Sequence, residues 1–360
     1  MSLLHVTAPC PYCYTDIDLR KVAFRCPGRA AVGKKECVKD IDRVRATHFG
    51  DLKEYYPAFV PSRTSLLSDM RRTQCPDCLG STGVRLCPQC HSRLPSGFSS
   101  DSSLFGLVGA RSSGKTVMLA VLMRELAMNG PVGRRFRDTI RLCKAGDNNG
   151  QEVRLERLLK QMESPLGQLP AQTQQADGDK TSPVVFEWQR ARRGIAKTVF
   201  GDFTSTVFSF YDTAGEDLAV DERALSMTYL LATNGIILLL DPFSFPGNAG
   251  RGSAAKDQRV ETAPENVLHA ITEVMRQNEA TKHNRKIKQP VAIVISKIDA
   301  FWSDIPENNP IRRPSSSLGY YDEAEGASVH DHIASMVSHW GGDGLLTMLE
   351  TNYENYRFFG

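Results

Sequence analysis

A glycine-rich loop between an apolar run and a helical segment constrains the fold of this chain more than any other feature. The stretch reads 104-LFGLVGARSSGKTVML-119, and residues 109–116, GARSSGKT, match the pattern G-x-x-x-x-G-K-[ST]. Such a loop binds phosphate, because its backbone N–H groups and the positive end of the following helix dipole face the phosphate oxygens. The strand before it and the helix after it favour this role over a chance glycine turn.

The residues of this loop have different predicted roles. Those whose backbone lines the phosphate are Gly109, Ala110, Arg111, Ser112, Ser113 and Gly114. Lys115 reaches the terminal phosphates, and Thr116 offers its hydroxyl to Mg²⁺. Arg111 also carries a charge, which either reaches the phosphates in cis or points to solvent.

A second element, 208-FSFYDTAGED-217, is an apolar strand that ends in Asp-Thr-Ala-Gly. Asp212, at the strand's end, can hold Mg²⁺ through water, and Gly215 can bring its N–H to a γ-phosphate because it has no Cβ. An aspartate at the end of a strand is common by itself. After a phosphate loop, the tetrapeptide is specific for one class of nucleotide-binding site.

A third element, 291-VAIVISKIDA-300, identifies the base. The Asp299 carboxylate can accept two hydrogen bonds from the N1 and N2 donors of guanine, and the stem of Lys297 can lie over the base. Adenine offers no such pair of donors. The sequence therefore predicts GTP or GDP as the nucleotide, with Mg²⁺.

The apolar runs after residue 104 predict an α/β domain with a mostly parallel sheet, because they alternate with helical and polar segments. The expected strands cover 104–108, 184–188, 206–212, 235–241 and 290–297. The expected helices cover 115–129, 264–278 and 328–350. The stretches 131–183, 243–262 and 301–327 are expected to be long loops.

Cysteines dominate the front of the chain, since eight of the nine lie before residue 91. Residues 75–90, CPDCLGSTGVRLCPQC, have the spacing C-x2-C-x8-C-x2-C, which predicts one structural Zn²⁺ site formed by Cys75, Cys78, Cys87 and Cys90. The remaining four, Cys10, Cys13, Cys26 and Cys37, predict a second Zn²⁺ site at irregular spacing. His5 or His48 is an alternative for one of its ligands.

These features divide the 360 residues into three expected domains. Residues 1–50 form a zinc-ribbon-like module, and 51–95 form a linker plus a second zinc ribbon. Residues 96–103 are a short linker, and the nucleotide-binding domain covers 104–360. The ninth cysteine, Cys143, is expected to be a plain thiol without a catalytic role.

Charge bears on the choice of partner for the cysteine-rich front. Residues 1–100 hold 15 Lys and Arg against 9 Asp and Glu, a net charge of +6. Two tetrathiolate zinc sites of charge −2 each reduce that to +2, which favours a protein partner over nucleic acid. Tyr12, Tyr14, Phe24, Tyr55 and Tyr56 either stack on bases or complete the small core.

The order of the three nucleotide-site elements resembles the translation-factor and Ras-like class of P-loop GTPases over roughly residues 104–360. The resemblance implies GTP hydrolysis in which Lys115, Thr181, Gly215 and Glu216 take part. Thr181 takes the place of the first-switch threonine whose hydroxyl closes on Mg²⁺. Thr173 and Ser182 are the alternatives for that role.

The sequence departs from this class in two side chains of the site. Ser296 replaces the usual Asn before Lys297, which keeps a hydroxyl. Glu216 replaces a water-orienting Gln and brings a carboxylate near the γ-phosphate, so hydrolysis is expected to be slow or partner-dependent.

The end of the chain departs from the class as well. The segment 354-ENYRFFG-360 resembles the start of the class's sixth strand, and we expect a domain truncated at that strand. The alternative is a domain that has lost its base-closing loop and a covering helix.

The zinc ribbons followed by this domain resemble the double-GTPase proteins of bacterial conflict systems. The expected function is a GTP-binding switch whose zinc ribbons dock a partner. The alternatives are a zinc-ribbon scaffold with a structural, non-hydrolysed nucleotide and a nucleic-acid-dependent NTPase. We expect no secretory signal from the first residues, and no apolar run has membrane-spanning length, so the expected location is the cytoplasm without membrane contact.

Overall fold

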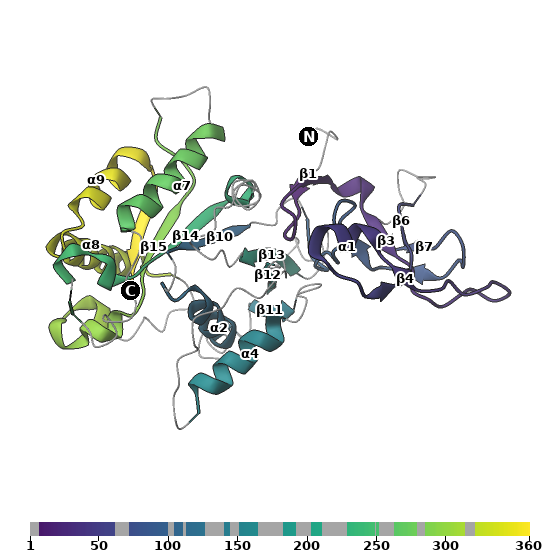
Figure 1. Ribbon diagram of the computed structural model, residues 1–360, viewed down its shortest axis with the longest axis horizontal. Coiled ribbons are helices and arrows are strands. Elements are labelled where there is room, and N and C mark those ends of the chain that lie inside the picture. The colour runs from purple at the N-terminus through teal and green to yellow at the C-terminus, as the bar shows by residue number, and fades with distance from the viewer. Residues whose placement is uncertain are drawn as a thin grey trace. The chain divides into compact units, whose positions relative to one another are not determined.

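The computed structural model describes the chain in several stretches (Figure 1). They are residues 7–61, 72–99, 104–110, 113–126, 140–144, 151–164, 183–191, 203–210, 229–248, 250–251, 263–278, 285–313 and 321–360. These stretches belong to two compact units. The first unit takes its residues from Met1–Leu104, Arg137–Arg154 and Ala176–Tyr211, and the second from Phe105–Phe136, Leu155–Gln175 and Asp212–Gly360.

A four-stranded parallel sheet forms the centre of the second unit. Its strands are β10 (Phe105–Gly109), β14 (Gly235–Leu240), β15 (Val291–Ile295) and β16 (Tyr356–Phe359), hydrogen-bonded in that order. The continuous aliphatic runs suit strands covered on both faces, and Leu107, Leu238 and Ile293 are fully buried. The predicted α/β class with a parallel sheet is confirmed for these four strands.

The helices of this unit follow the predicted segments with one difference. They are α2 (Lys115–Leu126), α7 (Pro264–Asn278), α8 (Glu323–His339) and α9 (Asp343–Asn352), and α7 contacts α9 while α8 contacts β16 (Figure 1). The prediction of one helix over 328–350 is wrong. Two glycines divide it: Gly341 has a φ of +83°, and a Cβ on Gly342 would lie 2.6 Å from Val337 Cγ1.

The strands expected at 184–188 and 206–212 belong to a different sheet from the one predicted. They are β12 (Val184–Ala191) and β13 (Phe203–Phe210), which with β11 (Ile140–Lys144) form a separate antiparallel sheet in the order β11-β12-β13. These three strands belong to the first unit. Strand β11 and helix α4 (Gln151–Met162) also lie inside 131–183, which we expected to be loop.

The cysteine-rich front contains short elements only. Its strands are β1 (Thr7–Pro9), β2 (Asp16–Asp18), β3 (Ala23–Arg25), β4 (Asp40–Ile41), β5 (Glu54–Tyr55), β6 (Ala58–Phe59), β7 (Thr73–Gln74), β8 (Ser81–Thr82) and β9 (Arg85–Leu86). Helix α1 (Arg43–Phe49) and the 3₁₀ turn η1 (Leu19–Lys21) complete it. Tyr12, Tyr14 and Phe24 are buried, so these aromatics belong to the core and cannot stack on bases.

Short 3₁₀ helices occupy parts of the other stretches expected to be loops. They are η2 (Pro242–Ser244), η3 (Pro246–Asn248), η5 (Ile298–Asp304) and η6 (Pro310–Arg312). Of the helices in the described stretches, none combines the length and the apolar character needed to cross a bilayer.

Candidate functional site

Two clusters of four cysteines lie in the front of the chain, and both mix its two halves. The first cluster joins Cys10 and Cys13 to Cys87 and Cys90, and the second joins Cys26 and Cys37 to Cys75 and Cys78. The predicted grouping, which put residues 75–90 in one site and Cys10 to Cys37 in the other, is therefore wrong. The arrangement is nested, with the outer pairs in one cluster and the inner pairs in the other. The expected domains 1–50, 51–95 and 104–360 remain a prediction, although residues of 1–50 and 51–95 contribute to both clusters.

Three of the four cysteine pairs share one backbone geometry, the knuckle. In residues 75–80, for example, the Leu79 N–H donates to the Cys75 carbonyl and the Cys75 N–H to the Gly80 carbonyl, both at 2.9 Å. The same two bonds recur in residues 10–15 and 87–92. The residue after the second cysteine has a φ between 53° and 59° each time; these residues are Tyr14, Leu79 and His91.

The fourth pair, Cys26 and Cys37, uses glycine in place of this knuckle. Gly28 has a φ of +77°, donates its N–H to Cys26 Sγ at 3.4 Å, and lies against the Tyr56 ring, where an added Cβ would be 2.2 Å from the ring carbon Cζ. Only glycine fits both conditions. This explains the irregular spacing in the sequence: the chain leaves Cys26 through a glycine turn and returns at Cys37.

The sulfur positions fit a tetrahedral metal ion. Four thiolates at about 2.3 Å from Zn²⁺ lie about 3.8 Å from one another. The Cys10–Cys90 and Cys13–Cys87 sulfurs lie 3.9 and 3.8 Å apart, and the Cys26–Cys78 and Cys37–Cys75 sulfurs 3.5 and 3.9 Å. All donors are cysteine, which suits a closed structural Zn²⁺ site. His48 is exposed and takes no part in either cluster.

Burial makes Cys10 and Cys37 poor acids without a metal. It raises the pKa of the Cys10 thiol well above its usual range and the pKa of Cys37 to about 11. A metal ion reverses this preference, because only the thiolate is a ligand. Metal binding should thus release protons and stabilise the fold of the front at the same time.

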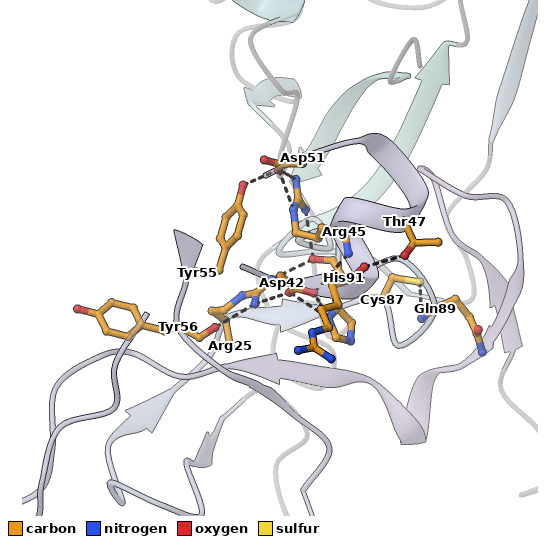
Figure 2. Close-up of polar contacts among 11 residues, drawn as sticks. Arg25, Asp42, Arg45, Thr47, Asp51, Tyr55, Tyr56, Cys87, Gln89 and His91 are labelled. Carbon is orange, nitrogen blue, oxygen red and sulfur yellow. Dashed lines mark hydrogen bonds and ion pairs between the residues drawn. The ribbon is translucent and has the colours of Figure 1, made fainter. Parts of the chain in front are cut away.

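A buried polar network supports the knuckle at residues 87–92 (Figure 2). Asp42 accepts from Arg25 Nη1 at 2.7 Å and contacts His91 Nδ1 at 2.9 Å. Its carboxylate also accepts from the Arg45 N–H, which caps helix α1. Burial raises the pKa of Asp42, but the hydrogen bonds from Arg25 and His91 outweigh it, so the pKa is lowered overall.

Arg45 is fully buried at the centre of this network. Its Nη2 donates to Asp51 Oδ2 at 2.9 Å, its Nη1 donates to the His91 carbonyl, and the Tyr55 hydroxyl donates to the same Asp51 oxygen (Figure 2). The Arg25 guanidinium reaches the His91 carbonyl as well. Helix α1 and strand β3 are thereby fixed to the knuckle that carries Cys87 and Cys90.

The glycine-rich loop of residues 109–116, which is the predicted phosphate loop, begins at the carboxyl end of β10. Lys115 is 6% exposed, and its Nζ donates to the carbonyls of Gly109 and Ala110 at 2.8 and 2.9 Å. Gly114 has a φ of +90°, which glycine alone adopts freely. Among the described residues none hydrogen-bonds to the buried Ser113 Oγ. A buried lysine bonded to carbonyls of the loop and a buried unsatisfied hydroxyl in the same loop are features expected of a site that receives an anionic group.

A second group of residues lies at the same edge of the parallel sheet. Lys297 follows β15 in the left-handed conformation, φ 51°, and its Nζ lies 2.5 Å from Asp241 Oδ2 at the end of β14. Ser296 Oγ donates to the Leu240 carbonyl. Asp299 is exposed, and among the described residues its carboxylate has no hydrogen-bond or ion-pair partner. Gly109 pairs with Leu239 and Leu240 with Ile295, so all these side chains follow the carboxyl ends of neighbouring strands.

Several predicted site residues lie outside the described stretches. They are His5, Arg111, Ser112, Thr173, Thr181, Ser182, Asp212, Gly215 and Glu216. Gly109, Ala110, Ser113, Gly114, Lys115, Thr116, Lys297 and Asp299 are described. The described part of the glycine-rich loop and the Lys297 segment thus follow two strands of one sheet, and the roles assigned to all these residues remain predictions.

Sequence reasoning missed Asp241. This residue ends the apolar run 235–241, is 4% exposed and pairs with Lys297. Its position was the available signal. Asp241 follows the strand that neighbours β10, and ligands bind in parallel sheets at the carboxyl ends of the strands. Sequence reasoning also missed the Asp42 and Arg45 network, which joins residues far apart in the chain.

Three comparisons place the chain among known proteins. No family model matches it. It is 21% identical to a protein of Mycolicibacterium smegmatis (strain ATCC 700084 / mc(2)155) described as "Putative ESX-1 scaffolding and assembly protein SaeC", over 95% of this chain and 86% of that protein. Among solved structures it is similar to a chain of the signal recognition particle receptor SRb-GTP/SRX complex from Chaetomium thermophilum, with 14% identity, 72% of this chain and 90% of that chain covered, and a TM-score of 0.30. That TM-score is too low for the match to bear on the fold.

Proposed function

We propose that this protein is a GTP-binding switch with zinc ribbons that dock a protein partner. The observation that carries the proposal is the position of two groups of residues at one edge of the parallel sheet. The phosphate loop follows β10, and Ser296 to Asp299 follow β15, with β14 between them. Nucleotides bind in parallel sheets at this edge.

Each residue of the site has a task in this proposal. Lys115 exchanges the Gly109 and Ala110 carbonyls for phosphate oxygens, and Ser113 gains a partner for its buried hydroxyl. Asp299 binds guanine, while Asp241 holds Lys297 where its stem can cover the base. When bound, Mg²⁺ supplies charge neutralisation between the phosphates. Thr116, Asp212 and Thr181 are the residues we assign to hold it.

Hydrolysis in this proposal needs no covalent intermediate, since phosphoryl transfer depends on positioning and charge stabilisation. Gly215 would present its N–H to the γ-phosphate, and Glu216 would occupy the place of a water-orienting side chain. The negative charge of Glu216 would repel the γ-phosphate that it faces, and a carboxylate lacks the amide N–H group of the usual Gln. We therefore expect slow turnover that a partner accelerates.

The choice of nucleotide is tested by comparing GTP and ATP affinities of the wild type, Asp299→Ala and a matched control, Asp304→Ala. Asp304 lies in the same 3₁₀ helix as Asp299 and forms an exposed ion pair with Arg251. We expect Asp299→Ala to weaken GTP binding at least tenfold and Asp304→Ala to leave it unchanged. Equal affinity of the wild type for ATP and GTP would refute the guanine assignment.

A second candidate function is a scaffold whose nucleotide is structural and never hydrolysed. The relative described as a scaffolding and assembly protein favours it, and so does Glu216. Phosphate release at saturating GTP, for the wild type and Glu216→Gln, separates the two. A switch should release phosphate slowly, and faster in Glu216→Gln. A scaffold should release none in either form.

The nucleic-acid-dependent NTPase is less well supported, because Tyr12, Tyr14 and Phe24 are buried and present no stacking surface. Nucleic-acid binding that weakens steeply as the salt concentration rises would support this alternative. A place in a bacterial conflict system is suggested by domain order and by the run 235–245, GIILLLDPFSF, which follows DTAGED in the sequence. It remains a prediction, as does a cytoplasmic location.

A further inference from the structure

The two cysteine clusters differ in how far solvent reaches their sulfurs. Seven of the eight cysteines in the clusters are buried, and Cys37 of the second cluster is partly exposed. The neighbours packed against the second cluster, Ala30, Tyr56 and Phe59, are themselves only partly buried. A small oxidant dissolved in water can therefore reach the second cluster at Cys37, whereas burial shields the first cluster.

The first cluster has supporting contacts on both of its knuckles. The polar network of Figure 2 fixes the knuckle at residues 87–92. On the knuckle at residues 10–15, Ser209 Oγ donates to the Pro11 carbonyl at 2.6 Å and lies 3.0 Å from the Tyr14 hydroxyl. Tyr14 and Ser209 are at most 2% exposed. The backbone that carries the four ligands of this cluster is thus fixed by bonds that do not involve the metal.

The second cluster has a knuckle on one side only. Its other side is the segment 27–39, which contains neither helix nor strand. None of the backbone hydrogen bonds in the described stretches involves residues 35–39, and all of these residues except Cys37 are exposed. Lys39 adds one contact, since its Nζ lies 5.2 Å from the centroid of the Tyr56 ring. The segment around Cys37 is therefore fixed chiefly by the bond from the Cys37 sulfur to a metal.

The Cys37 sulfur also lacks a hydrogen bond that three of the buried ligands have. Backbone N–H groups donate to the sulfurs of Cys10, Cys26 and Cys87 at 3.4 or 3.5 Å. In the described stretches no N–H group donates to Cys37 Sγ, which lies 3.9 Å from Cys75 Sγ. An N–H···S bond draws electron density from a thiolate and makes it a weaker nucleophile. Cys37 thus combines the most accessible sulfur with one that no such bond weakens.

We propose that Cys37 is a modification site, at which a peroxide oxidises the thiolate and Cys75 then closes a disulfide that releases metal from the second cluster only. The inference concerns the metal ligands and involves no nucleotide, so it goes beyond the proposed function and does not depend on it.

The reaction takes two steps, with hydrogen peroxide as the oxidant. The Cys37 thiolate attacks one peroxide oxygen, which breaks the O–O bond and gives a sulfenic acid and hydroxide. The Cys75 thiolate then attacks the Cys37 sulfur, displaces a second hydroxide and leaves the disulfide. The two thiolates lose two electrons in total, and the peroxide gains them. The sulfurs must close from 3.9 Å to about 2.0 Å, which residues 35–39 allow because no backbone bond fixes them.

The disulfide leaves two thiolates, Cys26 and Cys78, where a closed zinc site needs four ligands. The second cluster should therefore lose its metal while the first keeps its own. Contacts around metal ligands commonly change metal affinity about 10- to 100-fold, so peroxide should release one zinc equivalent at least about 10-fold faster than the other.

The test follows zinc release from the full wild-type chain to a colorimetric chelator after hydrogen peroxide is added, and maps disulfides by mass spectrometry of peptides. We expect one zinc equivalent to leave first, together with formation of a Cys37–Cys75 disulfide. Dithiothreitol followed by added zinc should restore the second equivalent. The disulfide map is a readout that a merely structural role of Cys37 would not move.

Two histidine variants show which cluster responds. Cys37→His keeps a side chain that zinc accepts as a ligand and removes the oxidisable sulfur. Cys13→His makes the same change in the first cluster and is the matched control. In peroxide, Cys37→His should retain both zinc equivalents, whereas Cys13→His should release one equivalent as fast as wild type does. The disulfide map of the wild type decides the question if a variant does not fold.

Release of both zinc equivalents at one rate would overturn the proposal. Release without a disulfide at Cys37, or a Cys37→His protein that loses zinc as fast as wild type, would overturn it as well. A disulfide from Cys37 to Cys26 or Cys78 would overturn the role of Cys75. A wild type that binds Zn²⁺ but no GTP would contradict the proposed function and leave this test intact.

Discussion

Strands β1 to β9 of the cysteine-rich front span two or three residues each, whereas β10, β14, β15 and β16 span four to six. The buried residues of the front include Cys10, Cys26, Cys75 and Cys87, while those of the parallel sheet are mainly aliphatic, such as Leu107, Leu238 and Ile293. Strands of two residues supply little ladder and little apolar burial. The front should therefore depend on bound metal for its fold, and the parallel sheet should not.

The largest expected effect comes from removing the metal. Structural Zn²⁺ sites contribute about 10 to 16 kcal/mol of apparent binding free energy in small domains. Cys10→Ser or Cys75→Ser, or stripping with a chelator, should unfold the front, while the amides of β14 and β15 stay protected. Hydrogen exchange measured by mass spectrometry on peptides from the two regions tests this.

Cys143→Ser is the matched control for metal removal, because Cys143 has no predicted metal role. It should leave two zinc equivalents and the exchange pattern unchanged. Equal loss of protection in β15 and in the front after stripping would show that the sheet also depends on the metal. A purified wild type without bound zinc and with a protected front would contradict the assignment of the clusters.

A smaller effect should follow from breaking the buried ion pair of Arg45. Arg45→Met leaves the Asp51 carboxylate buried without its guanidinium, a loss of about 3 to 5 kcal/mol in the free energy of unfolding. Arg357→Met is the matched control, because Arg357 and Arg45 each lie over a tyrosine ring. Arg357 pairs with the exposed Glu323, so its replacement should cost only about 0 to 1 kcal/mol in the free energy of unfolding. Urea unfolding at constant free zinc measures the free energy of unfolding of both variants. Equal losses would contradict the expectation that the buried ion pair of the front contributes more than the exposed one beside the parallel sheet.

How much of the fold the sequence predicts also differs between the regions. Continuous apolar runs located β14 and β15, because strands buried on both faces leave a local signal in the sequence. The expected helix 264–278 coincides with α7. The antiparallel pairing of β12 with β13 had a local signal too. The connection 192–202 is shorter than the dozen or more residues that a parallel crossover needs.

The cysteine grouping had no such signal. The spacing C-x2-C recurs in three knuckles of the same geometry, so it predicts each pair of ligands but carries no information on which pairs share a metal. That choice depends on long-range pairing of β3 with β6 and β9. The Lys297–Asp241 ion pair depends on strand order in the same way, since β14 and β15 become neighbours only in the folded sheet.

In the parallel sheet, replacing Asp241 should have an intermediate effect on binding rather than on folding. Asp241→Asn removes the charge that holds Lys297 and keeps a side-chain oxygen for the Phe243 N–H. A hydrogen bond to a charged group contributes about 1.5 to 3 kcal/mol, so GTP affinity should fall about 10- to 100-fold. The unfolding of the front should not change. An affinity equal to that of wild type, measured by calorimetry, would show that Lys297 needs no support from Asp241.

The smallest expected effect is a pH dependence confined to the edge of the parallel sheet. His330, in α8, accepts the Phe358 N–H at Nδ1, 3.0 Å away, and its ring lies beside Tyr356 and Phe358. Burial lowers the pKa of His330; Asp331 opposes this and Arg357 adds to it. Because the folded pKa lies below the unfolded value of about 6.5, the stabilisation is complete above pH 6.5 and is lost as pH falls through the folded pKa. The loss should be less than about 1 kcal/mol, because the ring is partly exposed and one hydrogen bond is involved.

Hydrogen exchange of the Phe358 amide measures this effect. The exchange rate, corrected for its intrinsic pH dependence, should rise below pH 6.5 in wild type but show no such step in His330→Gln. The Ile236 amide, in the same sheet and bonded to the Pro290 carbonyl, is the internal control and should not respond. The same step in both proteins would mean that the acid sensitivity comes from another group.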